Sequence, residues 1–297
     1  MSVKFILLQV LLFVEFKNLN TNENAIEVVP SVLFKQNDFQ SDWIVNSIWN
    51  EFIICKLPKL KSQIYPGATS YYADKDTNEW GPPEKLKSFK NALAITLKQY
   101  YDKNKESFFF FYNDQKPGET KSHGNRAQAK DVTFFGKTSG FWLIHSVPRF
   151  PSNAKYSYPK NGEVYGQSFL CVTMKTESIG TFAEAMKYID PAVYQMNLPK
   201  NFSDRFLFLK ELKILKKKNN PNSSLIQTFS SIGSLKFYDF LKTKKYDGDI
   251  VLHISDLYLD FIAKQMRISL FTETWMNGGE KDLNSECNTS HKISCKN

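Results

Sequence analysis

The chain has 297 residues, enough for one large α/β domain or two small domains with well-filled cores. Its 42% hydrophobic and 15% aromatic content indicates an ordered globular protein and excludes a low-complexity chain. The 39 Lys and Arg against 30 Asp and Glu give a net charge of 39 − 30 = +9, which suits a polyanionic partner but equally describes a lysine-rich soluble protein. No phosphate-binding loop, dinucleotide fingerprint, serine or cysteine nucleophile motif or metal-ligand cluster appears, so the enzyme classes that need them are not indicated.

The N-terminus has the layout of a secretory signal. Lys4 precedes Phe5–Val14, in which only Gln9 is polar, and this apolar run is too short to span a bilayer. We predict a signal peptide over residues 1–20, with cleavage somewhere within Lys17–Ala25. The mature protein is expected to be secreted, with a lysosomal or endosomal location as the alternative. No later segment could span a membrane, so no membrane partner is predicted.

The first half of the chain predicts strands and one helix. Apolar residues recur at spacings of three and four over Pro83–Tyr101, which predicts a helix. Phe108–Tyr112 is a continuous apolar run, typical of a central strand buried on both faces. Two earlier strands are expected, the second with an insertion: Ile26–Leu33 and Asp42–Leu57.

A hairpin is predicted next. Val132–Phe135 and Phe141–Ile144 are joined by the glycine-containing link Gly136–Gly140, a pattern typical of paired strands and their turn. The prolines of Ser146–Pro151 end the second strand. His145 stands at that strand end, where side chains often reach a cleft; from the residues alone, a hydrogen-bonded structural histidine is the simpler interpretation.

The second half predicts a buried strand over Ser168–Met174, a helix from Ser178 or Thr181 to Tyr188, and a helix over Asp204–Leu215. The later expectations are a strand at Ser224–Phe229, helical segments at Lys236–Leu241 and Ile250–Ile262, and a last strand at Met266–Phe271.

Sequons and cysteines agree with the secretory route. Cys171 lies inside an apolar run and is predicted to be a buried free thiol. Cys287 and Cys295 could close a small terminal loop by a disulfide, because the oxidising pathway permits it. The predicted glycosylation sites are Asn201, Asn222 and Asn288.

The stretch Gly140–Pro151, GFWLIHSVPRFP, resembles the strand and turn of the deoxyribonuclease II family, the acid endonucleases of lysosomes and secretions. The resemblance runs from about Asp42 to Cys287. Further matching stretches follow in order: Asp42–Trp43, Lys56–Leu60, Phe110–Gln115, Tyr156–Pro159, Tyr165–Val172, Asp190–Tyr194 and Phe271–Trp275.

The resemblance implies an α/β fold with mixed sheets flanked by helices, in the two-half architecture of phospholipase D-type phosphodiesterases. Each half of such a protein supplies one His-x-Lys motif. The second motif is expected well past Cys287 and the chain ends at Asn297, so the second half is expected to be incomplete. We therefore predict a deoxyribonuclease II-like domain over residues 26–287 and a tail over 288–297.

The resemblance also implies a chemistry without metal or cofactor. One histidine attacks phosphorus, the other protonates the leaving oxygen, and the lysines hold the phosphate. The first motif falls on Gln128-Ala129-Lys130, so the lysine is present but the histidine is a glutamine. An amide cannot take up a proton or attack phosphorus usefully. Lys130 and Arg149 are assigned to phosphate or DNA binding, and His145 to the lining of the cleft.

The expected function is therefore that of a secreted deoxyribonuclease II-family protein that is catalytically inactive or strongly impaired. It is expected to bind DNA without sequence preference and with a steep salt dependence. Two alternatives remain open: an active acid nuclease that uses His145, and a secreted interaction protein without a nucleic-acid role. The oligomeric state is also open.

Overall fold

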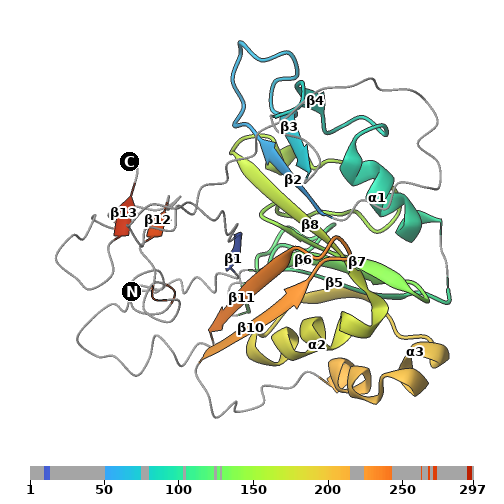
Figure 1. Cartoon of the computed structure of the whole chain (residues 1–297). Coiled ribbons are helices and arrows are strands. Elements are labelled where there is room, and N and C mark those ends of the chain that lie inside the picture. Colours follow the sequence, from blue (N-terminus) through green and yellow to red (C-terminus); the bar gives the residue numbers. More distant parts are fainter. Residues whose placement is uncertain are drawn as a thin grey trace.

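The main sheet has eight strands in the order β4-β3-β2-β8-β7-β6-β5-β9, and every neighbouring pair is antiparallel (Figure 1). The computed structural model describes residues 10–13, 51–74, 80–102, 105–123, 126–127, 129–214 and 224–242, together with 262, 267, 270–272 and 293–295. The strands of the main sheet are β2 Glu51–Lys56, β3 Thr69–Asp74, β4 Glu84–Lys85, β5 Phe108–Asn113, β6 Lys130–Phe135, β7 Ser139–His145, β8 Gln167–Lys175 and β9 Val193–Asn197.

The other described strands form two smaller sheets. β1 (Val10–Phe13), β11 (Lys236–Lys242) and β10 (Ser224–Ser230) form an antiparallel sheet in that order. β12 (Leu270–Thr272) pairs with β13 (Ile293–Cys295) in parallel. The predicted α/β class with sheets flanked by helices is confirmed, although each described sheet is of one kind: the two larger ones are antiparallel and the β12–β13 pair is parallel. The two-half arrangement stays a prediction.

Helices cover both faces of the main sheet (Figure 1). α1 (Ala92–Tyr101) packs on one face, and α2 (Ile179–Tyr188) packs on the other. The remaining helical elements are α3 Lys200–Arg205 and the 3₁₀ turns η1 Lys160–Gly162, η2 Thr176–Ser178 and η3 Leu207–Ile214.

The helix predicted over Pro83–Tyr101 is wrong over its first half. β4 takes Glu84–Lys85, and the helix begins only after Asn91, whose side chain accepts a hydrogen bond from the Ala94 N–H at 3.0 Å. The Asn91 amide also donates to the Leu86 carbonyl at 3.1 Å. This bond fixes a turn, so the apolar spacing before Asn91 does not continue the helical face.

Two other predicted helices also differ. Asp204–Leu215 was expected to be one α-helix, but α3 ends at Arg205 and a 3₁₀ helix follows. The apolar residues there recur every three positions, which is the 3₁₀ period and not the α period. Lys236–Leu241 is a strand, because its backbone pairs with β10 over the whole segment. The segments Ile26–Leu33 and Ile250–Ile262 fall outside the described residues, apart from Ile262 itself.

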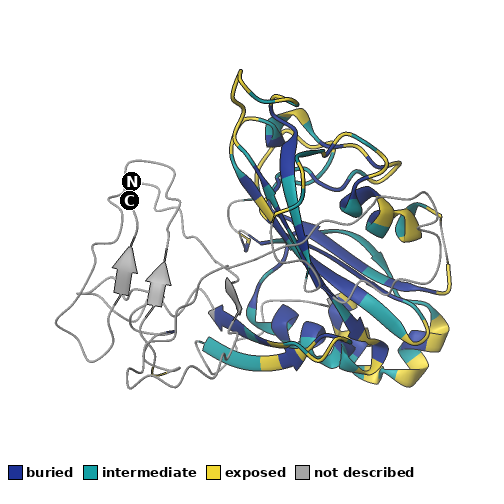
Figure 2. Ribbon diagram, turned by 45° about the horizontal axis from the view of Figure 1, so that its top comes forward, coloured by how far each residue is buried: buried dark blue, intermediate teal, exposed yellow. Residues whose placement is uncertain are grey.

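The strand predictions in the centre of the chain are confirmed. β5, the β6–β7 hairpin and β8 lie where the apolar runs predicted them, and α2 ends at Tyr188 as expected. β5 is buried on both faces, since Phe110 packs in the cluster under α2 and Phe111 in the cluster under α1. Figure 2 shows that buried residues concentrate in these central strands.

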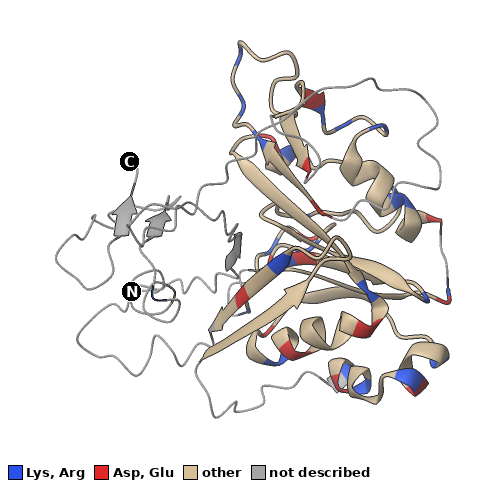
Figure 3. Ribbon diagram, viewed as in Figure 1, with Lys and Arg blue, Asp and Glu red and all other residues tan. Residues whose placement is uncertain are grey.

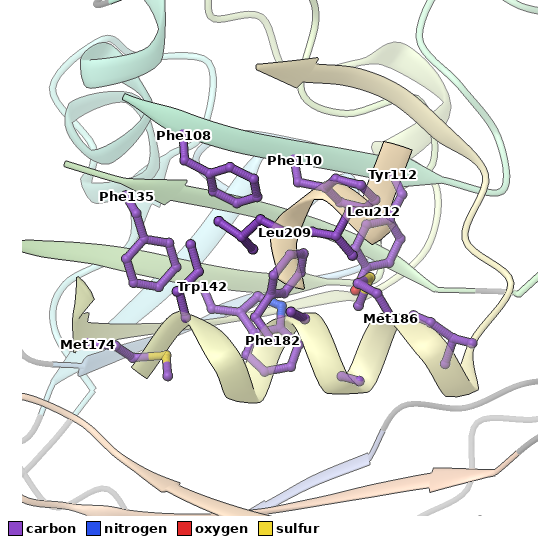
Figure 4. Packing of buried hydrophobic residues seen from close by; sticks show 14 of the residues in the cluster. Phe108, Phe110, Tyr112, Phe135, Trp142, Met174, Phe182, Met186, Leu209 and Leu212 are labelled. Carbon is purple, nitrogen blue, oxygen red and sulfur yellow. The ribbon is translucent and has the colours of Figure 1, made fainter. Parts of the chain in front are cut away.

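Aromatic rings fill the core between the sheet and α2 (Figure 4). Phe182 on α2 is fully buried, with its ring centroid 5.5 Å from Phe110, 5.5 Å from Trp142 and 6.4 Å from Phe108. These edge-on contacts join the helix to two strands, β5 and β7, so the packing of α2 on the sheet depends on this ring.

We expect Phe182→Ala to lower the free energy of unfolding by about 3–5 kcal/mol, because it leaves a cavity in a close-packed core. Phe89→Ala is the matched control, since Phe89 is 69% exposed and its removal should cost well under half as much. Urea denaturation of the two variants measures the difference. Equal losses would show that the ring cluster does not hold α2.

Candidate active site

Three neighbouring strands of the main sheet bring the predicted site residues to one edge. Asn113, the last residue of β5, is paired with Lys130, the first residue of β6. Asp131 is paired with Ile144, so the register places Lys130 across from His145, the last residue of β7. Cross-strand neighbours share one face of a sheet, and therefore Lys130 and His145 lie side by side.

Lys130 is held by a carboxylate. Its ammonium nitrogen lies 2.5 Å from Oδ1 of Asp114, and the exposed fractions of the two side chains are only 13% and 6%. The lysine charge is therefore neutralised inside the protein. A phosphate could reach it only by sharing the ammonium with Asp114 or by displacing that carboxylate.

His145 is buried and neutral. Its exposed fraction is 6%, and its ring lies 5.5 Å from Phe150 and 5.8 Å from Phe169. Nδ1 accepts a hydrogen bond from the Val147 N–H at 3.2 Å, so the ring proton is on Nε2, which has no hydrogen-bond partner in the described part of the chain. Burial, and next the charge of Lys130, lower the pKa of His145 to about 3. The ring therefore stays uncharged in mildly acidic solution.

The turn after β7 is fastened to the end of β5. The Asn113 amide donates to the carbonyls of Val147 at 3.0 Å and Phe150 at 3.1 Å. Arg149 lies in this turn with φ 60°; its N–H donates to the Gln115 carbonyl at 2.8 Å. Its guanidinium donates to a second loop carbonyl, that of Thr120, at 3.1 Å. Arg149 thus has a loop-holding role that the sequence did not predict.

Gln128, the residue at the first catalytic position of the motif, lies outside the described residues. Its described neighbours Ala127 and Ala129 are both buried, and the Ala127 N–H donates to the Asp190 carbonyl at 3.0 Å. Arg126 forms an ion pair with the Asp190 side chain. The chain on both sides of Gln128 is therefore fixed to the body of the protein.

A buried carboxyl cluster on the opposite face of β6 was not predicted from the sequence. Asp131 accepts hydrogen bonds from the Tyr112 hydroxyl and, at 2.9 Å, from Trp142 Nε1. Asp239 of β11 faces it and is held at 2.9 Å by the Gln227 amide. Burial raises the pKa of Asp131 from 3.8 to about 7, with Asp239 adding to the rise and Tyr112, Trp142 and Lys130 opposing it. The only signal in the sequence was the polar pair Lys130–Asp131 directly before the predicted strand Val132–Phe135.

The predicted modification sites are placed only in part. Asn201 is exposed on α3, and its amide donates to the Glu106 carbonyl at 3.2 Å. Cys171 is a buried free thiol, as predicted. Cys295 lies in β13, and the residues outside the described part are Asn222, Cys287 and Asn288.

Within the described ranges, no three His, Cys, Asp or Glu side chains form a group that could hold a metal ion. The helices in those ranges include none with the length and apolar character needed to cross a bilayer.

The Asp131 pKa predicts an acid-stabilised fold. Because the folded pKa lies above the ordinary value, the carboxyl contributes stability that is complete below pH about 4 and is lost as the pH rises through about 7. We expect Asp131→Asn to reduce the decrease in melting temperature between pH about 4 and pH about 7, because the amide stays neutral and its oxygen can still accept both hydrogen bonds. Asp102→Asn, which removes an exposed carboxylate at the C-terminal cap of α1, should leave the slope unchanged. An unchanged slope in Asp131→Asn would contradict this role.

Comparison with known proteins agrees with the motif at this edge of the sheet. The sequence model of the family Deoxyribonuclease II matches residues 49–296. Cell-death-related nuclease 7 of Caenorhabditis elegans is 33% identical over 244 residues, which are 80% of this chain and 64% of that protein. Cell death-related nuclease 6 of the same organism is 33% identical over 249 residues, 81% of this chain and 64% of that protein.

A less similar relative is named as a deoxyribonuclease. Deoxyribonuclease-2-beta of Homo sapiens is 27% identical over 251 residues, which are 82% of this chain and 67% of that protein. The chain spans less than two thirds of the length of the two Caenorhabditis elegans proteins above. The match of the family over residues 49–296 covers most of the chain, and the chain belongs to the deoxyribonuclease II family.

Proposed function

We propose that this chain is a deoxyribonuclease II-family protein that binds DNA but has lost, or nearly lost, hydrolysis through its first motif. One observation carries the proposal: the motif reads Gln128-Ala129-Lys130, and the histidine beside Lys130 is buried and neutral. Neither the residues of this motif nor His145 therefore supply a group that can exchange a proton in mildly acidic solution.

The chemistry explains why this loss matters. A phosphodiester bond breaks when a nucleophile attacks phosphorus and an acid protonates the departing oxygen. The amide of Gln128 can do neither, because it has no basic lone pair on nitrogen. His145 cannot replace the missing acid, since its pKa of about 3 leaves it unprotonated where acid nucleases work. This argues against an active nuclease that uses His145.

DNA binding is supported by the net charge of the chain and by its similarity to nucleases. The relatives named above are called nucleases or deoxyribonucleases, and the chain carries a net charge of +9. Lys130 keeps the position that holds phosphate in the family, although Asp114 competes for it. Binding is expected to be weak and free of sequence preference, because contacts to phosphates carry no base information. His145 adds no positive charge to this binding in mild acid, because its pKa is about 3.

Export belongs to the same proposal. The apolar run Phe5–Val14 after Lys4 supports a cleaved leader, and the exposed Asn201 sequon supports glycosylation. Secretion and delivery to an acidic compartment share these features. N-terminal sequencing of the protein recovered from the medium of expressing cells tests both the export and the cleavage point.

For catalysis, we expect the unchanged chain to leave supercoiled plasmid intact at acid pH in the presence of a metal chelator. Gln128→His alone should stay near background, since groups that act as a unit are not additive. A known acid deoxyribonuclease serves as the positive control in the same buffer. Robust cleavage by the unchanged chain would refute the proposal, and robust cleavage by Gln128→His would show that a second acid is already present.

For binding, we expect Lys130→Met to weaken association with duplex DNA to the same extent for every sequence, and to reduce the salt slope by about one. Asp114→Asn should strengthen it, because the lysine loses its internal partner. Lys98→Met is the control, since Lys98 forms a comparable ion pair with Asp102 on the exposed surface of α1. Fluorescence anisotropy over a salt series measures all three. Equal losses for Lys130→Met and Lys98→Met would show that the site does not hold phosphate.

A further inference from the structure

Two neighbouring loops at one end of the main sheet expose large apolar side chains. Leu60 and Ile64 lie in the loop between β2 and β3, and Val164 and Tyr165 lie in the loop before β8. Their exposed fractions are between 51% and 69%. We call these four residues the apolar tip. The loop after β2 projects from the body of the protein (Figure 1). The apolar tip is therefore a protruding surface and not a pocket that a small ligand could fill.

The loops that carry the apolar tip are held firmly. The Lys59 N–H donates to the Val164 carbonyl at 3.0 Å, which joins the two loops directly. The ammonium of Lys56 is buried beneath them and donates to the carbonyls of Gly162 at 2.7 Å, Glu163 at 2.6 Å and Tyr165 at 2.6 Å. Inside the first loop, the Gln63 amide donates to the Pro58 carbonyl at 2.9 Å. The tip is thus presented in a fixed shape, and a partner would not have to order it.

Positive charge surrounds the apolar tip. Lys59, Lys61 and Lys160 are exposed on the same two loops, and residues 52–73 contain no Asp or Glu. Glu163, the acidic residue between the loops, is paired with Lys87 at 2.6 Å. Figure 3 likewise shows basic and no acidic residues on the projecting loop after β2.

We infer that this surface docks on an anionic lipid bilayer, with the apolar tip inserted at the headgroup boundary and the lysines over acidic headgroups. Lysines near such a membrane are attracted by its negative surface potential, and apolar side chains gain by leaving water. The phosphates of duplex DNA would attract the same lysines, but they offer nothing to the aliphatic residues Leu60, Ile64 and Val164. The sequence predicted no membrane partner because no segment could span a bilayer, and peripheral docking needs no spanning segment.

Cosedimentation of the full chain with vesicles tests the inference. We expect binding to phosphatidylcholine vesicles that contain phosphatidylserine, and little binding to phosphatidylcholine alone. Leu60→Ser with Ile64→Ser should weaken binding about tenfold or more, since two apolar side chains are lost from the bilayer. Lys59→Gln with Lys61→Gln should weaken it by roughly fivefold per lysine and reduce its salt dependence.

Leu207→Ser is the matched control, because Leu207 is as exposed as the tip residues but lies in η3, on the α2 side of the sheet. All variants have the same N-terminus, so differences between them cannot come from the N-terminal apolar run. Melting curves confirm that each variant is folded. Equal binding by the tip double variant and Leu207→Ser would overturn the inference. So would a loss of duplex DNA affinity in the tip double variant without a loss of vesicle binding, because the tip would then be a DNA contact.

Discussion

The ion pair between Lys130 and Asp114 is the contact on which the interpretation of the site depends. It is nearly removed from solvent, so its charges are satisfied internally and not by a ligand. A lysine that binds phosphate would be expected to expose its ammonium group to solvent. Instead its ammonium is held by the Asp114 carboxylate. Burial, and next the charge of Lys130, keep the His145 ring uncharged, so Lys130 bears on both the phosphate site and the proton chemistry beside it.

The same edge of the sheet shows how the fold positions these groups. Strand pairing sets Asn113, Lys130 and His145 in adjacent places, and the Asn113 amide then draws the following turn over the histidine. The opposite face of β6 carries a second polar group, Asp131, whose protonated form the fold prefers. An acid-stabilised core is consistent with a protein that works in an acidic setting, whether or not it cleaves its ligand.

The sequence predicted what depends on local pattern. Continuous apolar runs located β5, β6, β7 and β8, and the glycine-containing link located their hairpin. The prediction was wrong where pairing with another strand determines the secondary structure. Lys236–Leu241 was expected to be helical, but it forms a strand because its backbone pairs with β10. The signal peptide predicted over residues 1–20 includes Val10–Phe13, which pairs with β11 in the full chain, and its cleavage stays a prediction. Local hydrophobicity cannot distinguish a segment that is removed from one that joins a sheet.

The motif and the resemblance identified Lys130 and His145 as site residues, but they could not show the ion pair of Lys130 or the protonation state of His145. The partnership with Asp114 and the burial of the ring arise from the pairing of β5, β6 and β7 and from Phe150 and Phe169, and no spacing rule in the sequence contains these contacts. Nuclear magnetic resonance of the His145 ring nitrogens would show whether this ring is neutral. We predict a neutral ring, protonated at Nε2, whose chemical shifts do not change between pH about 7 and pH about 4, as expected for a pKa of about 3. A titration with a midpoint near the ordinary histidine value, about 6.5, would contradict it.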